Sequence, residues 1–392
     1  MDIQNKKMNK EAILVAFLLF ALAGSYFFWW LTTNLVLNIA TKLFICFIFY
    51  KYKKQRTHTD RMAVTLYCVA LSLMVLLSIM HGNTTFFGAI DRLLNFAMIP
   101  ILLVGTEFSE QVYRHFFKIY AVVVGLSLIA FVFYMLGMLP AIGELTSGQE
   151  RSYTVYPFLV RENTISLSVF SRFCSVFDEP GVVGTFSAIL LCINRFNLKD
   201  WKNIIVLLAG IISMSMFFYA LVAIYAFLFL IITKRNYILA LVVCMAMGAF
   251  YYVTKDDPYI SEVMWARFEW DEDKGGFIGD DRMVGDADYY FENKIQGTPA
   301  YWWGTDNIKE FWEYSEGSSS YKVVVASNGM VFLTLYILVF IVLAYGYKNN
   351  RSDLILFVLV LLLNSYQRPN IYYPIWIFLY MYYARLKLEN IK

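Results

Sequence analysis

Long apolar runs alternate with short polar segments along most of the chain. Many runs reach about 18 residues or more, the length that a helix needs to cross a bilayer. The run over 203–233 exceeds one crossing, so we divide it at the polar sequence SMSM, residues 213–216. The pattern predicts twelve membrane-spanning helices, near residues 11–31, 34–50, 62–80, 89–105, 119–139, 181–194, 203–214, 216–233, 237–254, 321–346, 354–367 and 371–385. We therefore expect an all-α polytopic membrane protein.

Composition agrees with this pattern. Hydrophobic residues make up 59% of the 392 residues and charged residues only 16%, whereas soluble domains carry about a quarter charged residues. The five cysteines show no paired spacing, which argues against a disulfide framework or a zinc site. The N-terminal segment MDIQNKKMNK lacks a small-residue cleavage site, so we expect the first apolar run to be retained as a span.

Lysine and arginine predict the orientation. With the N-terminus inside, the inner segments hold 20 of the 33 Lys and Arg residues, as the positive-inside rule requires. Two outer segments are long, and the second contains 16 Asp and Glu residues against 6 Lys and Arg. The chain therefore divides into N-terminal spans (1–139), a first outer loop (140–180), central spans (181–254), a second outer loop (255–320) and C-terminal spans (321–392).

The end of the first outer loop has a polar stripe at helical spacing. Thr164, Ser168, Ser171, Arg172 and Ser175 share one face of a helix drawn over 161–180. This spacing predicts an amphipathic helix at the outer membrane surface.

Asp178 and Glu179 follow this stripe, and Pro180 suits the first turn of the sixth span. In one interpretation the two acids cap that helix and Arg172 pairs with one of them. In the other, the helix N-terminus and Arg172 bind an anion, and a carboxylate beside them serves as a base.

The second outer loop contains Arg282 within an acidic stretch, followed by aromatic residues. Tyr289, Tyr290, Tyr301, Trp302 and Trp303 offer flat faces on which sugar rings stack. An aromatic belt at the membrane interface is the alternative.

Three further cations are candidates for substrate binding: Arg92, Lys322 and Arg368. Lys322 and Arg368 lie at outer helix ends, where anchoring at the interface is the simpler explanation. Arg92 follows Asp91 inside the fourth span, where charges are costly and usually paired or functional. No histidine occurs after His115, and neither a phosphate-binding loop nor a clear metal-ligand spacing is present. We expect no metal, no cofactor and no nucleic-acid partner.

Four sequence motifs carry a family resemblance. The segment SRFCSVFDEPGVVG has the order Arg…Phe-x-Glu-Pro-Gly before a span. The sequence DDRM precedes a glycine-containing turn, GTPAYWWG. The run SSSYKVVVASNGM precedes a late span, and YQRPN lies at a C-terminal outer end. Together with the span count and the inner N-terminus, these motifs resemble bacterial O-antigen polymerases of the Wzy type, within the O-antigen ligase and polymerase superfamily.

The resemblance implies a GT-C-type helical bundle in the bacterial inner membrane with its active site facing the periplasm. It implies polymerisation of oligosaccharide repeat units carried on undecaprenyl pyrophosphate. A chain-length regulator and a flippase would be partners. Arg172 and Arg282 would hold the pyrophosphate, with Arg368, Lys322 and Arg92 as further binding residues, and Glu179 or Asp178 would activate the acceptor.

Three alternatives stay open. A ligase of the same superfamily typically uses a late outer-loop histidine, which this chain lacks. A flippase for lipid-linked sugars would carry its charges in central spans, whereas the charges here concentrate in outer loops. A purely structural membrane protein is the third alternative.

Overall fold

The computed structural model describes the chain apart from residues 1, 55–56, 83–85, 147–151, 164–171, 235–236, 258–260, 262–264, 267–268, 273–275, 278–285, 316–319, 368–372 and 387–392. The chain forms two compact units. The first comprises Met1–Val123 with Val284–Lys392, and the second comprises Val124–Met283.

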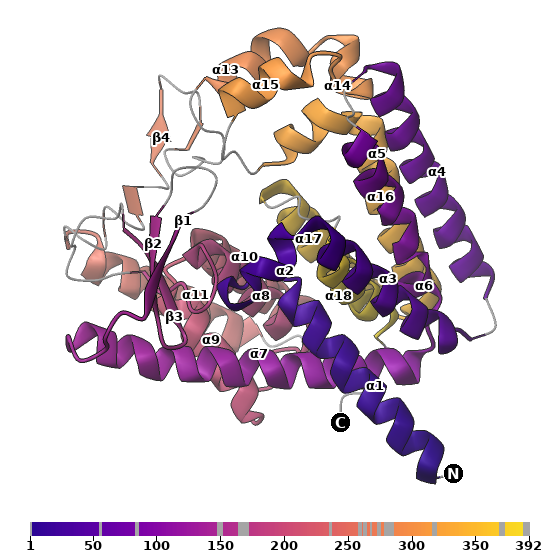
Figure 1. The fold of residues 1–392 in the computed structure, drawn as a ribbon. Helices are drawn as coiled ribbons and strands as arrows, with labels where there is room; N and C mark the ends of the chain where they lie inside the picture. Colours follow the sequence, from indigo (N-terminus) through magenta and orange to yellow (C-terminus); the bar gives the residue numbers. More distant parts are fainter. Residues whose placement is uncertain are drawn as a thin grey trace. The chain divides into compact units, whose positions relative to one another are not determined.

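The first unit is helical throughout the part that is described (Figure 1). Its elements before the second unit are α1 (Asp2–Ala21), η1 (Tyr26–Phe28), α2 (Trp29–Thr33), α3 (Leu35–Lys51), α4 (His58–Met80), α5 (Phe86–Leu94), η2 (Asn95–Met98), α6 (Ile99–Leu103) and the start of α7 (Thr106–Met135). Its later elements are α13 (Ala287–Tyr290), the π-helical η6 (Phe291–Ile295), α14 (Pro299–Trp303), α15 (Ile308–Ser315), α16 (Tyr321–Tyr347), α17 (Arg351–Gln367) and α18 (Pro374–Arg385).

The core of the first unit forms around α16, which packs against α4, α14, α17 and α18. Aromatic side chains join these helices. The Tyr67 and Tyr336 rings lie 5.7 Å apart between α4 and α16, and the Phe340 and Tyr380 rings lie 5.4 Å apart between α16 and α18. Such pairs add specific geometry to the burial of large apolar surfaces. At one end of α16, α13, α14 and α15 form a small layer, which we call the cap (Figure 1).

The second unit continues from the end of α7. Its strands are β1 (Gly143–Thr146), β2 (Ser152–Tyr156), β3 (Leu159–Glu162), β4 (Trp270–Asp271) and β5 (Gly276–Phe277), and its helices are α8 (Pro180–Ile193), α9 (Trp201–Ile212), α10 (Met216–Leu228), the π-helical η3 (Phe229–Thr233) and α11 (Tyr237–Thr254). The first three strands form an antiparallel sheet in the order β1-β2-β3, in which Thr154 pairs with Glu144 and with Arg161.

Helix α8 is the centre of the second unit. Its sequence PGVVGTFSAILLCI is apolar on all sides, and 13 of its 14 residues are buried. A helix with this composition is stable only when other elements surround it, and here α9 and α10 pack on it. The division of residues 203–233 into two helices is confirmed, because α9 ends at Ile212 and α10 begins at Met216.

Two sequence predictions about the first outer loop are wrong for the described residues. The chain is mostly helical but not all-α, because β1, β2 and β3 form a sheet among its described residues. The amphipathic helix over 161–180 is absent from its described parts: β3 extends to Glu162, and residues 172–179 form turns and irregular backbone. Ser175 adopts a φ of 55°, a left-handed conformation that a regular right-handed helix excludes. Thr164, Ser168 and Ser171 lie outside the described residues.

Two predicted spans are interrupted. The run over 11–31 breaks after Ala21, where Gly24 has a φ of 86°, and resumes in η1 and α2. The run over 89–105 divides into α5, η2 and α6, with Pro100 in the first turn of α6. Proline removes a backbone donor and ends helical hydrogen bonding from the preceding turn. Apolar runs therefore located the helices but did not ensure that they are continuous.

Three helices among the described residues are long and apolar enough to cross a membrane: α4, α7 and α16. The helical segments Tyr26–Thr33 and Leu35–Lys51 meet at 97° and add a fourth crossing if they form one broken span. Helices α8 and α9 and the segment Met216–Ile232 are apolar but shorter. These helices support a polytopic membrane protein, and the count of twelve crossings stays a prediction.

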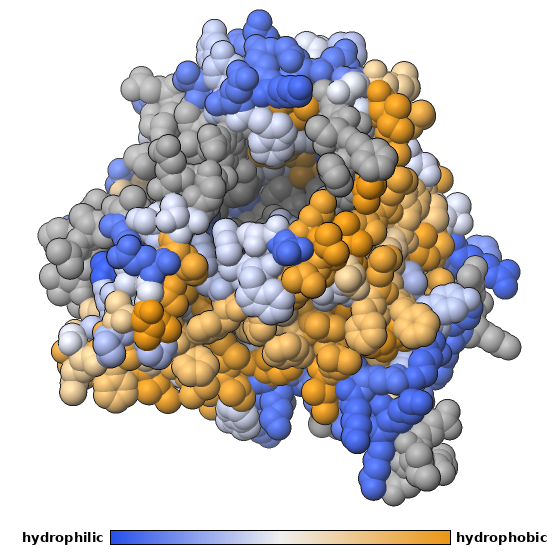
Figure 2. All heavy atoms as spheres, in the orientation of Figure 1, coloured by the Kyte–Doolittle hydropathy of each residue, from blue (hydrophilic) through white to orange (hydrophobic). Residues whose placement is uncertain are grey.

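The surface of the first unit separates apolar from polar regions. Val36 and Phe47 on α3 and Met80 on α4 are at least two-thirds exposed. Figure 2 shows an apolar surface over α4 and its neighbours and a hydrophilic surface over α13 and α15. Apolar side chains exposed in this number are stable in contact with lipid. The separation fits a bundle in the membrane that carries a cap in water.

Candidate functional site

The first candidate site is the entrance to α8. Glu179 precedes this helix with extended backbone, at φ −132° and ψ 143°, and Pro180 occupies the first turn. The Glu179 side chain makes no capping hydrogen bond to α8. Asp178 and Glu179 are both half-buried. Glu179 is therefore not explained as a helix cap, which was one of the two interpretations of this carboxylate.

Arg172 is held by the turn between α9 and α10. Its Nη2 atom donates a hydrogen bond of 3.2 Å to the Met214 carbonyl oxygen. Met214 lies between the two helices with a φ of 48°. The turn therefore presents a carbonyl group to a guanidinium group from a distant part of the chain.

Buried contacts fix the chain between Arg172 and Glu179. The Phe173 ring packs edge-on against Phe131 at 5.5 Å, and the Phe177 ring stacks on Phe186 of α8 at 5.7 Å. The Ser175 hydroxyl donates to the Ser127 hydroxyl at 2.8 Å. This segment has no regular secondary structure, so side-chain burial positions the cation and the carboxylates at its two ends.

This arrangement can bind and act on an anionic substrate. A helix N-terminus carries partial positive charge and unpaired backbone N–H groups, and an arginine adds a fixed positive charge with several donors. A carboxylate at the same entrance can accept a proton.

The other predicted residues divide between the two units or lie outside the described residues. Arg282 and Arg368 lie outside them. Arg92 is half-buried on α5. The Lys322 Nζ atom is 2.7 Å from Asp288 Oδ1 and 3.6 Å from Glu292 Oε1. Two carboxylates thus balance the charge of Lys322, which favours a structural role in holding the cap on α16.

Glycines in two motifs form the junction between the cap and α16. Gly329 breaks α16 with a φ of 83° and a ψ of 156°, a conformation open almost only to glycine. A Cβ atom at this position would lie 2.2 Å from the Trp302 carbonyl oxygen. Gly304 has a φ of 87° and packs in turn against the Ser327 carbonyl group. The sequences GTPAYWWG and SSSYKVVVASNGM therefore meet through their backbones.

The cap has an aromatic interior. The Tyr290 ring lies 5.8 Å from the Phe311 ring and 5.4 Å from the Tyr314 ring. Burial raises the pKa of the Tyr290 hydroxyl, and the neighbouring Glu310 carboxylate raises it further. Tyr290 therefore stays protonated at neutral pH. Tyr289, Trp302 and Trp303 are exposed, and the stacking of sugars on them stays a prediction.

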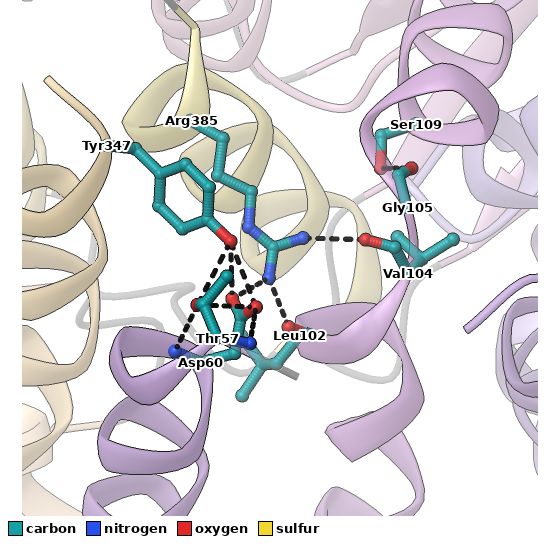
Figure 3. Close-up of polar contacts among 8 residues, drawn as sticks. All are labelled: Thr57, Asp60, Leu102, Val104, Gly105, Ser109, Tyr347 and Arg385. Atoms are coloured by element: carbon teal, nitrogen blue, oxygen red, sulfur yellow. Dashed lines mark hydrogen bonds and ion pairs between the residues drawn. The ribbon is translucent and has the colours of Figure 1, made fainter. Parts of the chain in front are cut away.

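Sequence reasoning missed a buried polar cluster in the first unit, shown in Figure 3. The Asp60 carboxylate forms an ion pair of 2.8 Å with Arg385 Nη2. The Tyr347 hydroxyl donates to Asp60 and lies 2.9 Å from both carboxylate oxygens. Thr57 and Asp60 form a capping box at the start of α4. The Thr-x-x-Asp spacing could have revealed the capping box, but no local signal links Asp60 to a residue 325 positions away.

Arg385 also ties α18 to the end of α6. Its Nη1 atom donates to the Val104 carbonyl oxygen at 2.8 Å, and its Nη2 atom donates to the Leu102 carbonyl oxygen. Nearby, Lys348 Nζ forms a buried ion pair of 2.9 Å with Asp353. Lys348 and Arg385 are both buried and paired with acids. We call Asp60, Arg385 and Tyr347 the helix clamp.

No group of three or more His, Cys, Asp or Glu side chains that could hold a metal ion occurs in the part of the chain that the structure describes. No family model matches the chain, and no curated protein or solved structure matches it either.

Proposed function

We propose that this chain is a membrane glycosyltransferase that polymerises oligosaccharide repeat units carried on undecaprenyl pyrophosphate. The product would be an O-antigen or a related surface polysaccharide, made at the periplasmic face of the bacterial inner membrane. Support comes from the four motifs of the Wzy-type pattern and from a helical chain with several apolar helices. The polymerase pattern is strongest in the segment from Arg172 to Gly184.

The observation that carries the proposal is the arrangement at the α8 entrance. Glu179 lies at the N-terminus of a buried helix without capping it, and Arg172 is fixed seven residues earlier by the Met214 carbonyl group. A side chain used only as a cap would accept hydrogen bonds from the first turn of the helix. A half-buried carboxylate at a helix entrance can accept a proton from a hydroxyl group, and an arginine and a helix N-terminus suit a phosphate group.

The chemistry needs few protein groups. A hydroxyl oxygen of the acceptor sugar attacks the anomeric carbon of the donor, and a new carbon–oxygen bond forms. The bond from that carbon to the phosphate oxygen breaks, and the lipid pyrophosphate leaves with its electron pair. Glu179 takes the hydroxyl proton as a general base. Arg172 and the α8 N-terminus stabilise the charge on the departing pyrophosphate. We assign the same role to Arg282 because it belongs to the DDRM motif of the Wzy-type pattern.

The test uses a strain that lacks its own copy of the protein and receives Glu179→Gln, Arg172→Ala or Arg282→Ala. Each variant should lose the ladder of polymer on a gel at wild-type protein levels, because each removes a base or a charge that the reaction needs. Glu144→Gln on exposed β1 and Arg114→Ala on α7, whose side chain is 73% exposed, serve as matched controls and should keep the ladder. Normal ladders from all three site variants would contradict the proposal.

The glycan of the deletion strain separates this function from its alternatives. Loss of a polymerase leaves single repeat units attached to the acceptor lipid. Loss of a ligase leaves polymer on the carrier lipid, and loss of a flippase leaves repeat units inside the cell. Either of the last two products would assign the chain to a different class.

A further inference from the structure

The turn between α9 and α10 contacts both Arg172 and helix α8. It holds Arg172 through the Met214 carbonyl oxygen, at 3.2 Å from Nη2. Because the acceptor is a backbone atom, the position of Arg172 depends on where the turn lies and not on a side chain at 214. The turn itself is well fixed, since Ser213 and Ser215 are almost fully buried and the Ser213 hydroxyl donates to the Gly210 carbonyl oxygen at 2.7 Å.

The same turn packs directly on α8. A Cβ atom at Gly184 would lie 2.3 Å from Ser215 Cβ and 2.6 Å from Ser215 Oγ. Both separations are far below van der Waals contact, so no larger residue fits at 184 unless the turn moves. Gly184 lies five residues after Glu179 on the same buried helix. The absence of a side chain at Gly184 therefore sets the distance between the turn and the helix that begins at Glu179.

We infer that the α9–α10 turn is a positioning element, in which the Gly184–Ser215 contact places the Arg172 guanidinium group relative to the α8 entrance. This inference rests on the proposed function, because it assigns Arg172 a substrate phosphate. Gly184 and Ser215 are positioning residues that act through Arg172. A shift of the turn by the width of one methyl group would move the cation away from the charge that it stabilises.

The test measures initial rates of polymer formation by the purified full-length protein with a lipid-linked repeat unit as substrate. Gly184→Ala should lower the rate about tenfold or more, since a misplacement of about 1 Å can have a large effect on catalysis. The double variant Gly184→Ala with Ser215→Gly should recover to within about threefold of wild type, because it removes the two nearest atoms that the new methyl group meets and leaves Phe218 Cβ, at 3.2 Å, as the remaining close contact. Gly248→Ala is the matched control, since nothing lies within 4 Å of that α11 position.

A second comparison separates positioning from general damage to the fold. If Gly184→Ala acts through Arg172, adding it to Arg172→Ala should cause no further loss of rate. Two substitutions that act independently would instead multiply their separate effects on the rate. Recovery of the rate in Gly184→Ala with Ser215→Gly, and the absence of a further loss of rate in Gly184→Ala with Arg172→Ala, together support the inference.

Several outcomes would overturn the inference. A folded Gly184→Ala protein with a wild-type rate would do so, as would multiplicative losses with Arg172→Ala. If Gly184→Ala does not fold, Ser215→Thr adds a methyl group from the other side of the same contact, and a wild-type rate in that variant would also refute the inference. Wild-type rates for both Arg172→Ala and Glu179→Gln would instead refute the proposed function. Loss in those two variants with a normal Gly184→Ala would refute only the positioning role.

Discussion

The helix clamp gives the sharpest prediction about stability. Replacing Arg385 by Met removes the cation but leaves the Asp60 carboxylate, whose side chain is only 10% exposed. It also removes the donors to the Leu102 and Val104 carbonyl groups. Breaking a buried ion pair from one side typically costs about 3–5 kcal/mol, because the remaining charge is uncompensated. The Tyr347 and Thr57 donors to Asp60 remain, so we expect the free energy of unfolding to fall by about 3 kcal/mol.

Replacing Asp60, alone and together with Arg385, tests whether the loss of stability comes from the unpaired buried charge. Asp60→Asn should also cost about 3 kcal/mol, since it leaves a buried guanidinium group without its carboxylate. The double variant Asp60→Asn with Arg385→Met should lose less than the sum, by about 2 kcal/mol or more, because it leaves no unpaired charge. Arg114→Ala breaks an exposed pair with Glu110 and should change stability by less than about 1 kcal/mol.

The assay is unfolding of the purified protein in one detergent mixture, followed by tryptophan fluorescence as denaturing detergent is added. Glycosyl transfer should be compared at a temperature where each variant is folded. Losses below about 1 kcal/mol for both single variants would refute the reasoning. Additive losses in the double variant would show that Asp60 and Arg385 stabilise the bundle independently and not as a pair.

Two further predictions concern the cap. Gly329→Ala should cost more than about 3 kcal/mol, because it combines a left-handed φ with a clash against Trp302. Gly297→Ala, with a similar φ of 76° but open space around it, should cost only about 1–2 kcal/mol; equal losses in the same unfolding assay would contradict the role of the clash. Lys322→Met should weaken the cap by about 1 kcal/mol, because its ion pairs are partly exposed. Faster proteolysis within 286–315 would report this loss, and Lys294→Met, at an exposed position, should leave the proteolysis rate unchanged.

The positions of most helices could be predicted from the sequence, because apolar runs are a local property. The division at Ser213–Ser215 was predicted because residues 203–233 exceed one bilayer crossing, and Met214 indeed forms a turn there with a positive φ. The interruption after Ala21 and the strands β1, β2 and β3 were not predicted. The strands were missed because each has only four or five residues, and pairing partners are what distinguish so short a strand from a loop.

The candidate site was partly accessible to sequence reasoning. The motif around Arg172 and Glu179 pointed to the α8 entrance, but the carbonyl group that holds Arg172 lies 42 residues later. The helix clamp could not be predicted at all. Asp60 and Arg385 belong to polar segments that look like ordinary charged helix ends, and their pairing follows only from the packing of α4 against α16 and of α16 against α18.

The sequence by itself determined that this chain is mostly helical and apolar enough to enter a membrane, and where its apolar helices lie, because the free energy of placing a residue in lipid depends on its own side chain. It also marked the residues around Glu179 as a candidate site through their order along the chain. Only the tertiary structure decided which charges are buried and paired, which glycines permit close approach, and which carbonyl group orients Arg172. These features depend on distances between residues far apart in sequence, which no local pattern encodes.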